Sequence, residues 1–402
     1  MRRMMLLLGA VALGVALAVG TSGAGNAAGS VRARWAITDL GTLGGGFSDA
    51  VAINDRGQII GYSSTAQRGT HAFLWQRGKM INLGTLGGRK SFASAINERG
   101  QIVGNSGTGK GSTHAFLWQN GHMTDLRVLS GGKDSTAVAI NGSGQIVGTS
   151  DSASGWGHAF LWKKGKMRDL GTLGGRRSSA KAINERGEIV GESSTAAGTT
   201  HAFLWRKGRM IDLGTLGRGN VSTAVALNAR GEIGGTSSTG KGDTEHAFLW
   251  RGGKMLDLGD FGGDHGSWFI ALNNSGQILV QSAQHTCCGG GPAPWYGFLW
   301  QQGKSVNLGT IGARVGDPLA EYPDPLFDTT EPFALNQRGQ VVGSSSTNDH
   351  NGAFIWQDGT MIILDRLGSD PLAFAINENN QIIGNATIKG QYHAVLWTLR
   401  NG

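Results

Sequence analysis

Two segments of the sequence carry residue types that could bind or transform a ligand. Residues 281–295 contain a histidine, two adjacent cysteines and a tryptophan, and residues 309–332 are rich in carboxylates. Paired carboxylates supply the acid and the base of glycan cleavage, whereas exposed aromatic rings stack on sugars or fill a protein pocket. The predicted ligand-binding residues of the two segments are His285, Cys287, Cys288, Trp295, Asp317, Glu321, Tyr322 and Asp324.

Cys287 and Cys288 are the only cysteines of the chain. Adjacent residues lie about 3.8 Å apart between their Cα atoms, which is below the usual disulfide range, so a bond between them would be strained. Two alternatives stay open, namely a strained disulfide in a stiff eight-membered ring and a pair of free thiols. The sequence predicts no cofactor.

Six histidines recur at one position of a repeat and suggest a ring of metal ligands: His71, His114, His158, His201, His246 and His393. Zinc ligands must lie within about 2 Å of one ion, whereas these side chains are expected about 10 Å apart. We therefore predict no metal site and expect each imidazole to hydrogen-bond the backbone or a neighbouring unit. No nucleophile motif, phosphate loop or HExxH sequence occurs, so no catalytic residue is predicted.

These residues are positioned by a repeat, whose most regular part is the pentapeptide His71–Trp75. Its tryptophan occurs eight times, at spacings of 43, 44, 43, 45, 50, 56 and 41 residues. The second unit shows four strand-like segments, at residues 93–96, 101–104, 114–118 and 123–126. A period of about 40–45 residues with four strands per unit is typical of a propeller blade. We predict an all-β, eight-bladed β-propeller of four-stranded antiparallel blades.

An Asn-x-x-Gly sequence such as Asn97–Gly100 joins the first and second strands of each unit. Asn97 can cap this turn through its own side chain, and Gly100 takes a positive φ without steric cost. In the last unit the glycine position is Asn380, the next best residue for that conformation. The asparagine recurs as Asn54, Asn97, Asn141, Asn184, Asn228, Asn273, Asn336 and Asn377.

The two ends of the sequence complement each other. The last unit ends at Arg400 without a fourth strand, while Trp35–Leu40 is a fourth strand with no unit before it. We predict that this N-terminal strand pairs with His393–Trp397, completes the last blade and closes the ring, which leaves no unpaired edge. In such a blade the loop at 281–295 and the linker at 309–332 emerge on the same face, which we term the loop-bearing face.

The units resemble the HAF repeat of bacterial extracellular proteins. The resemblance rests on Asn-x-x-Gly-Gln-Ile, His-Ala-Phe-Leu-Trp and Asp-Leu-Gly-Thr-Leu-Gly-Gly, which recur in this order from about residue 35 to the end and weaken in the sixth and seventh units. It implies an exported repeat protein and no known reaction.

The N-terminus is typical of a secretory leader, because a basic start is followed by the apolar run Leu6–Val19 and by small residues. We predict a removed signal peptide at residues 1–29 and a single propeller domain at 30–402. The apolar run is too short for a transmembrane helix, so a secreted, extracellular monomer without integral membrane association is expected. The net charge is +8, but no nucleic-acid module is present and no nucleic-acid partner is predicted.

Two functions are consistent with these features. The first is a non-catalytic protein that binds an extracellular glycan or protein ligand on the loop-bearing face. The alternative is a polysaccharide hydrolase or lyase that uses the acidic residues of 309–332.

Overall fold

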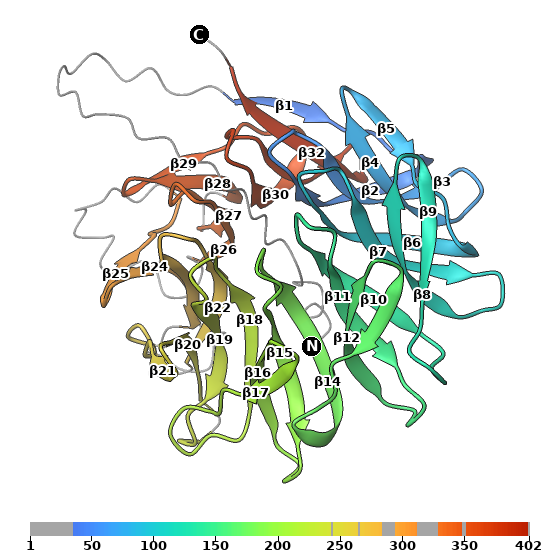
Figure 1. Cartoon of the computed structure of the whole chain (residues 1–402). Coiled ribbons are helices and arrows are strands. Elements are labelled where there is room, and N and C mark those ends of the chain that lie inside the picture. The colour runs from blue at the N-terminus through green and yellow to red at the C-terminus, as the bar shows by residue number, and fades with distance from the viewer. Residues whose placement is uncertain are drawn as a thin grey trace.

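The computed structural model of the protein describes residues 35–242, 244–263, 266–283, 294–311, 329–347 and 351–400. Within these ranges every regular element is a β-strand, and there is no helix long and apolar enough to cross a membrane. Antiparallel four-stranded sheets stand side by side around one axis (Figure 1). The protein is therefore a β-propeller, as predicted; the predicted signal peptide lies outside the described residues.

Five sheets have four strands each, which follow one another in chain order. Their strands are β10 (Ser135–Ile140), β11 (Ile146–Asp151), β12 (Gly157–Lys163) and β13 (Lys166–Asp169); β14 (Gly174–Ile183), β15 (Ile189–Thr195), β16 (Thr200–Arg206) and β17 (Arg209–Asp212); β18 (Ser222–Leu227), β19 (Ile233–Ser238), β20 (Glu245–Arg251) and β21 (Lys254–Asp257); β22 (Ser267–Leu272), β23 (Ile278–Ala283), β24 (Trp295–Gln301) and β25 (Lys304–Asn307); and β26 (Thr329–Leu335), β27 (Val341–Ser346), β28 (Asn351–Gln357) and β29 (Thr360–Ile363).

The remaining strands belong to one sheet of 12 strands. They are β1 (Trp35–Asp39), β2 (Gly44–Ile53), β3 (Ile59–Thr65), β4 (Thr70–Gln76), β5 (Lys79–Asn82), β6 (Gly87–Ile96), β7 (Ile102–Thr108), β8 (Thr113–Gln119), β9 (His122–Arg127), β30 (Ser369–Ile376), β31 (Ile382–Ile388) and β32 (Gln391–Leu399). Inside it, β4 pairs with β6 and β2 with β32 through one parallel residue pair each, whereas the other pairings are antiparallel.

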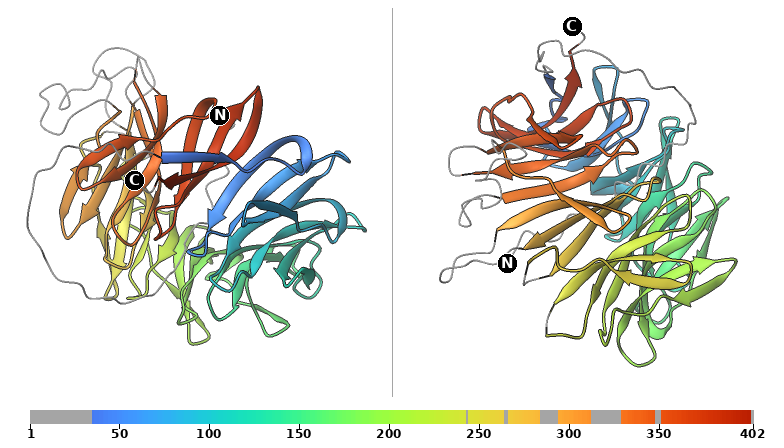
Figure 2. Two further views of the ribbon diagram at one scale, coloured as in Figure 1. Left: turned by 90° about the horizontal axis from the view of Figure 1, so that it is seen from above. Right: turned by 90° about the vertical axis from the view of Figure 1, so that its left-hand side faces the viewer.

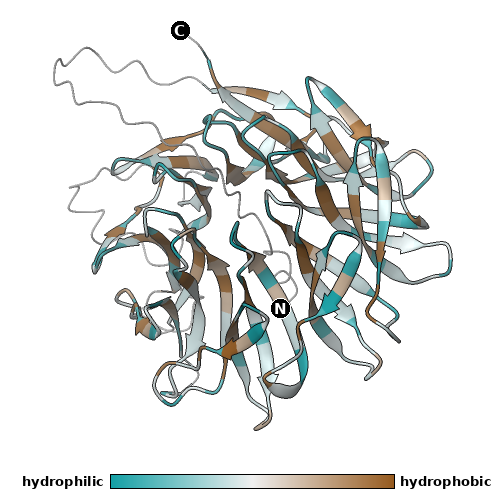
Figure 3. Ribbon diagram, viewed as in Figure 1, coloured by the Kyte–Doolittle hydropathy of each residue, from teal (hydrophilic) through white to brown (hydrophobic). Residues whose placement is uncertain are grey.

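The core lies between neighbouring sheets. Phe73, Phe116 and Phe160, from the repeated pentapeptide, are fully buried, and Leu74 packs in one cluster with Phe116 of the next unit. Apolar residues therefore follow the strands while polar residues collect in the turns (Figure 3). A sheet that lies between two neighbouring sheets packs against one of them on each face. Both of its faces are therefore apolar, as the strand sequences indicate.

The tight turns follow from their sequences. Asn120 and Gly121 have φ values of 52° and 83°, as a two-residue hairpin of type I′ requires. A close approach explains another glycine: a Cβ on Gly148 would lie 1.9 Å from the carbonyl oxygen of Thr136, where the β10–β11 register shifts. No residue larger than glycine fits this bulge without displacing the backbone.

Strand β1 pairs antiparallel with β32, from Trp35 opposite Leu399 to Asp39 opposite Val395. This is the pairing of the chain ends that the sequence predicts, and it places the first and last strands of the chain side by side (Figure 2). Trp35 is only 3% exposed and lies in one apolar cluster with Trp397.

Candidate functional site

The Asn-x-x-Gly turns organise the structure near the axis. The Oδ1 atom of Asn97 accepts the backbone N–H groups of Arg99 and Gln101 at 3.0 and 3.1 Å, so the side chain caps its own turn as predicted. Gly100 closes the turn with φ +75° and donates its N–H to the Asn97 carbonyl at 3.0 Å. The Nδ2 atom of Asn97 then donates to the carbonyl oxygen of Asn141 in the next unit, at 3.0 Å.

This last bond is repeated in every unit. Each of the eight asparagine side chains donates to the carbonyl oxygen of its counterpart in the following unit, at 3.0 to 3.5 Å. The bond from Asn377 to the carbonyl of Asn54 returns the series to its first member. The eight asparagines are almost completely buried, so each bond satisfies a polar group that would otherwise be costly.

A second series involves the residue that follows each asparagine. The N–H of Asp55, for example, donates to Glu98 Oε1 at 3.0 Å, and the N–H of Glu378 donates to Asp55 Oδ1 at 2.9 Å. Four further bonds link Gly142 to Glu185, Ala229 to Asn274, Asn274 to Gln337, and Gln337 to Glu378, with a donor–acceptor distance of 2.6 to 2.9 Å. The series is incomplete at two places, because residues 142 and 229 have no oxygen in their side chains.

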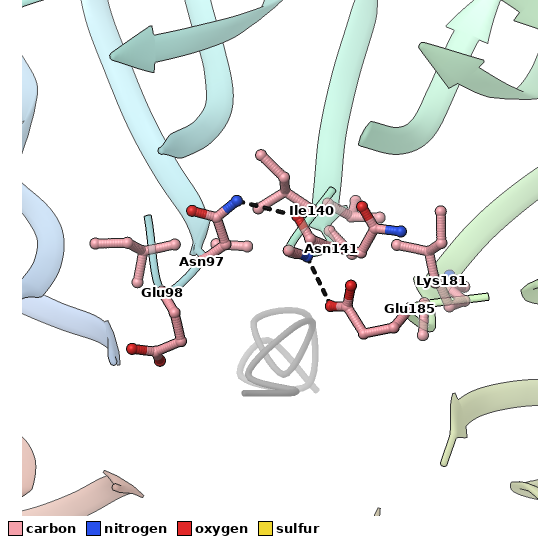
Figure 4. A pocket seen from close by; sticks show the side chains of 13 residues that line it. Asn97, Glu98, Ile140, Asn141, Lys181 and Glu185 are labelled. Carbon is pink, nitrogen blue, oxygen red and sulfur yellow. Dashed lines mark hydrogen bonds between the residues drawn. The ribbon is translucent and has the colours of Figure 1, made fainter. Parts of the chain in front are cut away.

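A pocket lies at the first of these two places. Its walls come from the turns and the first strands of three successive units, and its cavity volume is about 90 Å³. Figure 4 shows Glu98 and Glu185 on opposite sides of Asn141. A Cβ added to Gly142 would meet the Glu185 carboxylate at 3.0 Å. The absence of a side chain at position 142 therefore lets the Glu185 carboxylate lie against the Gly142 backbone, whose N–H it accepts at 2.6 Å.

The electrostatics of this pocket are dominated by its carboxylates. Burial raises the pKa of the Glu98 carboxyl above its ordinary value; the hydrogen bond from Asp55 N–H opposes this shift, and the negative charge of Asp55 adds to it. Lys181 also lines the pocket, but its Nζ forms an ion pair with Glu192 at 3.1 Å. A carboxyl group that keeps its proton above the usual pH can act as a general acid.

Of the residues predicted to bind a ligand, only Trp295 belongs to the described part of the chain. It opens β24, is half-buried, and its ring centroid lies 4.8 Å from that of Trp268. Trp268 Nε1 in turn donates to Glu245 Oε2 of the neighbouring sheet at 3.2 Å. Trp295 thus packs against a tryptophan of its own sheet, and Trp268 makes the contact with the next sheet. The other predicted residues lie outside the described residues: His285, Cys287, Cys288, Asp317, Glu321, Tyr322 and Asp324.

The repeated histidines have partners other than those expected. In five units the imidazole Nδ1 contacts an aspartate of the fourth strand in the same sheet, at 2.8 to 2.9 Å, as in His158 with Asp169. His71 contacts Asn82 in the same way. The expectation of a backbone or neighbouring-unit partner is therefore wrong: the pair joins the third and fourth strands of one sheet. At the chain ends it joins His393 to Asp39.

Sequence reasoning missed both pairings although the signals were present. The aspartate follows the histidine by eleven residues in four units, for example at positions 114 and 125. Likewise, aligning the units would have shown an oxygen-bearing residue after the asparagine everywhere except at Gly142 and Ala229. What no alignment reveals is that the first of these exceptions opens a pocket.

Neither a known protein family nor a curated protein matches this sequence. Among solved structures, the chain is similar to the β-propeller domain of the Trilobed protease from Pyrococcus furiosus, with 8% identity, a TM-score of 0.47, and coverage of 76% of this chain and 93% of that domain. A puromycin-hydrolyzing peptidase of Mycobacterium tuberculosis shows 12% identity and a TM-score of 0.46 over 77% of this chain and 51% of its own. An oligogalacturonate lyase in complex with manganese shows 10% identity and a TM-score of 0.43 over 73% and 84%.

These comparisons correct the first of the two predicted functions. The similar solved structures include a peptidase, puromycin hydrolases and a lyase; they do not support the prediction of a non-catalytic binding protein, which is not proposed again. At such low identity the likeness concerns the fold alone and assigns no reaction to this chain. The reaction has to be argued from the pocket itself.

Proposed function

We propose that the protein is a glycoside hydrolase whose acid and base are the two glutamates of the pocket at Gly142. The observation that carries the proposal is that Glu98 and Glu185, on either side of Asn141, both line one pocket. Burial raises the pKa of Glu98, which makes it the acid. Glu185 is then the base, since glycoside hydrolysis requires one protonated and one ionised carboxyl group.

The reaction breaks the bond between the anomeric carbon and the glycosidic oxygen. Glu98 transfers its proton to the departing oxygen through the carboxyl oxygen that does not accept the Asp55 amide. Water adds its hydroxyl to the anomeric carbon and gives its other proton to Glu185, so one sugar leaves as an alcohol, the other as a hemiacetal with a free reducing end, and one water is consumed. Exchange of protons with solvent then returns Glu98 to its protonated and Glu185 to its ionised form. Removing either group should cost about 10²–10⁴ in rate.

Hydrolysis is favoured over elimination by the charges of the pocket. A lyase acts on uronates, whose carboxylates need cationic partners, whereas this pocket places two glutamates together and its Lys181 is already paired with Glu192. An anionic sugar would be repelled there by Glu185, the carboxylate that is ionised in the proposed reaction. The acidic residues of 309–332, which the sequence suggested for the same class of reaction, lie largely outside the described residues.

The test is release of reducing ends from a panel of polysaccharides by wild-type protein and by Glu98→Gln and Glu185→Gln variants. Glutamine accepts the same backbone bond, as Gln337 does for the Asn274 amide, so both variants should fold. Glu232→Gln is the matched control, because Glu232 only bonds the Asn228 side chain of its own turn. Loss of activity in the two pocket variants but not in the control is expected. Wild-type protein inactive on the whole panel, or fully active pocket variants, would refute the proposal.

The architecture that holds the site is also part of this proposal: eight four-stranded blades in a closed ring. The cyclic series of asparagine bonds supports it, since its last member returns to Asn54. The pairing of β1 with β32 supports closure through the chain ends. The 12-stranded sheet divides into three blades at its two single-residue bridges, Phe47 with Tyr392 and Thr70 with Lys90.

We further propose that the protein is a secreted, monomeric member of the HAF-repeat proteins that meets its glycan outside the cell. Support comes from the leader-like residues 1–29 and from the repeated motifs of the sequence. N-terminal sequencing of protein recovered from the culture medium is the direct test. A chain that stays in the cell with Met1 in place would contradict export.

A further inference from the structure

One histidine of the repeat has a hydroxyl partner in addition to its aspartate. His201 Nδ1 lies 3.0 and 2.9 Å from the two carboxylate oxygens of Asp212, and its Nε2 lies 3.2 Å from Thr199 Oγ1. The hydroxyl of Thr195 lies 2.7 Å from that of Thr199. A hydroxyl, an imidazole and a carboxylate thus follow one another in hydrogen-bond contact.

The chemistry of these groups fixes the direction of the bonds when the imidazole is neutral. An ionised carboxylate only accepts, so Nδ1 of His201 carries the proton and donates it to Asp212. Nε2 is then the acceptor, and the hydroxyl of Thr199 donates to it. In this arrangement a histidine can remove the proton of an attacking hydroxyl, while the carboxylate holds the imidazole in the required tautomer.

The hydroxyl contact is not needed to position the histidine. Four other units hold the same pair of histidine and aspartate, at similar distances, without a bond from the histidine Nε2 to a hydroxyl among the described residues. In other units the residue two positions before the histidine is Gly69, Ser112, Trp156, Thr244 or Gln391. The hydroxyl of Thr244 donates to the carbonyl of Lys241 instead. The three-residue arrangement therefore occurs in one unit of the described chain, as a departure from the repeat.

The surroundings of Thr199 leave room for a substrate. Thr199 is half-buried, and the preceding residues Ala196–Gly198 are small and exposed. Its neighbour Thr200 donates its N–H to the carbonyl of Asn220 at 3.3 Å and pairs with Val221. Val221 is 40% exposed, so an apolar side chain lies at the surface next to the hydroxyl.

This site is separate from the pocket at Gly142. The turn that carries Glu185 precedes β15, whereas the loop that carries Thr199 follows it. A strand of this length keeps its two ends about 20 Å apart. A reaction at Thr199 therefore does not depend on the proposed glycoside hydrolase.

We propose that Thr199, His201 and Asp212 form a second catalytic site, which hydrolyses esters of short acyl groups. The Thr199 oxygen attacks the carbonyl carbon of the ester while Nε2 of His201 takes the hydroxyl proton. His201 gives this proton to the departing alcohol oxygen, the bond between that oxygen and the acyl carbon breaks, and the acyl group remains on Thr199.

The second half of the reaction repeats these transfers with water. Water attacks the acyl carbon and gives a proton to Nε2 of His201, which passes it to the departing Thr199 oxygen. One ester and one water give one alcohol and one carboxylic acid. We assign the hydrogen bond to the oxyanion to the side-chain amide of Asn220, which donates to no other described residue. Val221 contacts the acyl group, and one side chain of its size favours short chains.

The experiment follows hydrolysis of 4-nitrophenyl acetate and 4-nitrophenyl octanoate. Thr199→Val replaces the hydroxyl with a methyl group of similar size and should lower kcat/KM by about a hundredfold or more, as should His201→Asn. Asn220→Ala should lower it by about tenfold or more. Thr199→Ser keeps the hydroxyl and should keep the activity. The matched controls are Ser112→Ala and His158→Ala, at the same two positions of other units, and both should lie within about twofold of the wild type.

Acid quenching during turnover of the acetate, followed by mass spectrometry of peptides, should find one acetyl group on Thr199. Circular dichroism confirms that each variant is folded; if His201→Asn is not, Thr199→Val decides. Undiminished activity of Thr199→Val, equal losses in the controls, acetyl groups on lysines alone, or a wild type without esterase activity would overturn the proposal. Faster hydrolysis of the octanoate would overturn the preference for short chains.

One further comparison keeps the two proposed activities apart. Glu98→Gln should retain the hydrolysis of the acetate, and Thr199→Val should retain the release of reducing ends from polysaccharides. Loss of ester hydrolysis in Glu98→Gln would place that reaction in the pocket and refute the site at Thr199. A protein inactive on every polysaccharide but acylated on Thr199 would refute the glycoside hydrolase and support the second site.

Discussion

Replacing Trp35 tests how much the N-terminal strand contributes to stability. Trp35 is the large buried side chain of β1, 3% exposed, and it packs in a cluster with Leu364, Ile382 and Trp397. Trp35→Ala empties this site, and truncation of a buried tryptophan costs about 3–5 kcal/mol in the free energy of unfolding. Such a loss is a large fraction of the stability of an ordinary domain.

Trp35→Phe should behave very differently. The indole Nε1 of Trp35 is buried and has no hydrogen-bond partner in the described structure. Removing an unpaired buried N–H recovers about 1–3 kcal/mol, which offsets the packing lost by the smaller ring. We therefore expect the free energy of unfolding of Trp35→Phe to lie within about 1 kcal/mol of the wild type.

The assay is urea unfolding followed by far-ultraviolet circular dichroism, with size-exclusion chromatography of the folded protein. Trp156→Ala is the control, because Trp156 lies in the β11–β12 loop and is stacked under Arg177 at 4.1 Å; its loss should cost about 0.5–1 kcal/mol. Aggregation is expected for Trp35→Ala alone, since a loosened β1 exposes the edge of β32. Wild-type behaviour of Trp35→Ala, or equal losses in Trp35→Ala and Trp35→Phe, would refute this reasoning.

Three further predictions concern the repeated polar residues. Asn377→Ala and Asn141→Ala remove the same bonds at the chain ends and in mid-chain, so each should lower the free energy of unfolding by about 2–4 kcal/mol in urea titrations; clearly unequal losses would contradict a continuous series. Burial raises the folded-state pKa of Glu98 above 4.5, so stability should fall as the pH rises from 4.5 through that pKa. Melting temperatures of Glu98→Gln should show a smaller fall over this window, and an identical profile would count against the shift. His158→Ala breaks the contact with Asp169 and should cost about 0.5–1.5 kcal/mol without altering bound zinc measured by mass spectrometry; zinc that is stoichiometric in the wild type and lost in the variant would disprove a structural role.

The fold was predictable because its determinants are local and repeated. The asparagine of each turn binds N–H groups two and four residues later, as Asn97 does with Arg99 and Gln101, and such short-range bonds follow from residue type and spacing. The hairpin at Asn120-Gly121 can likewise be predicted from its two residues. The pairing of β1 with β32 can be predicted because the last unit lacks a fourth strand of its own.

The site was less predictable, and the sequence directed attention to another face. The insertions at 281–295 and 309–332 stand out because they break the repeat, whereas the pocket arises where the repeat is nearly perfect and one side chain is merely absent, at Gly142. A missing side chain is conspicuous only when its neighbours in space are known. The prediction of the histidines' hydrogen-bond partners was wrong for a related reason. His158 and Asp169 are eleven residues apart in the sequence, and only the β12–β13 hairpin brings them into contact.

The sequence by itself determined the strands, the turns and the order in which the units follow one another, because these depend on periodicity and on residues a few positions apart. Only the tertiary structure decided which polar groups meet between units. Glu98 and Gly142 are 44 positions apart, and their relation depends on how closely two sheets approach at the axis. That approach brings Glu98 and Glu185, from different units, to the lining of one pocket, which is the feature on which the proposed chemistry depends.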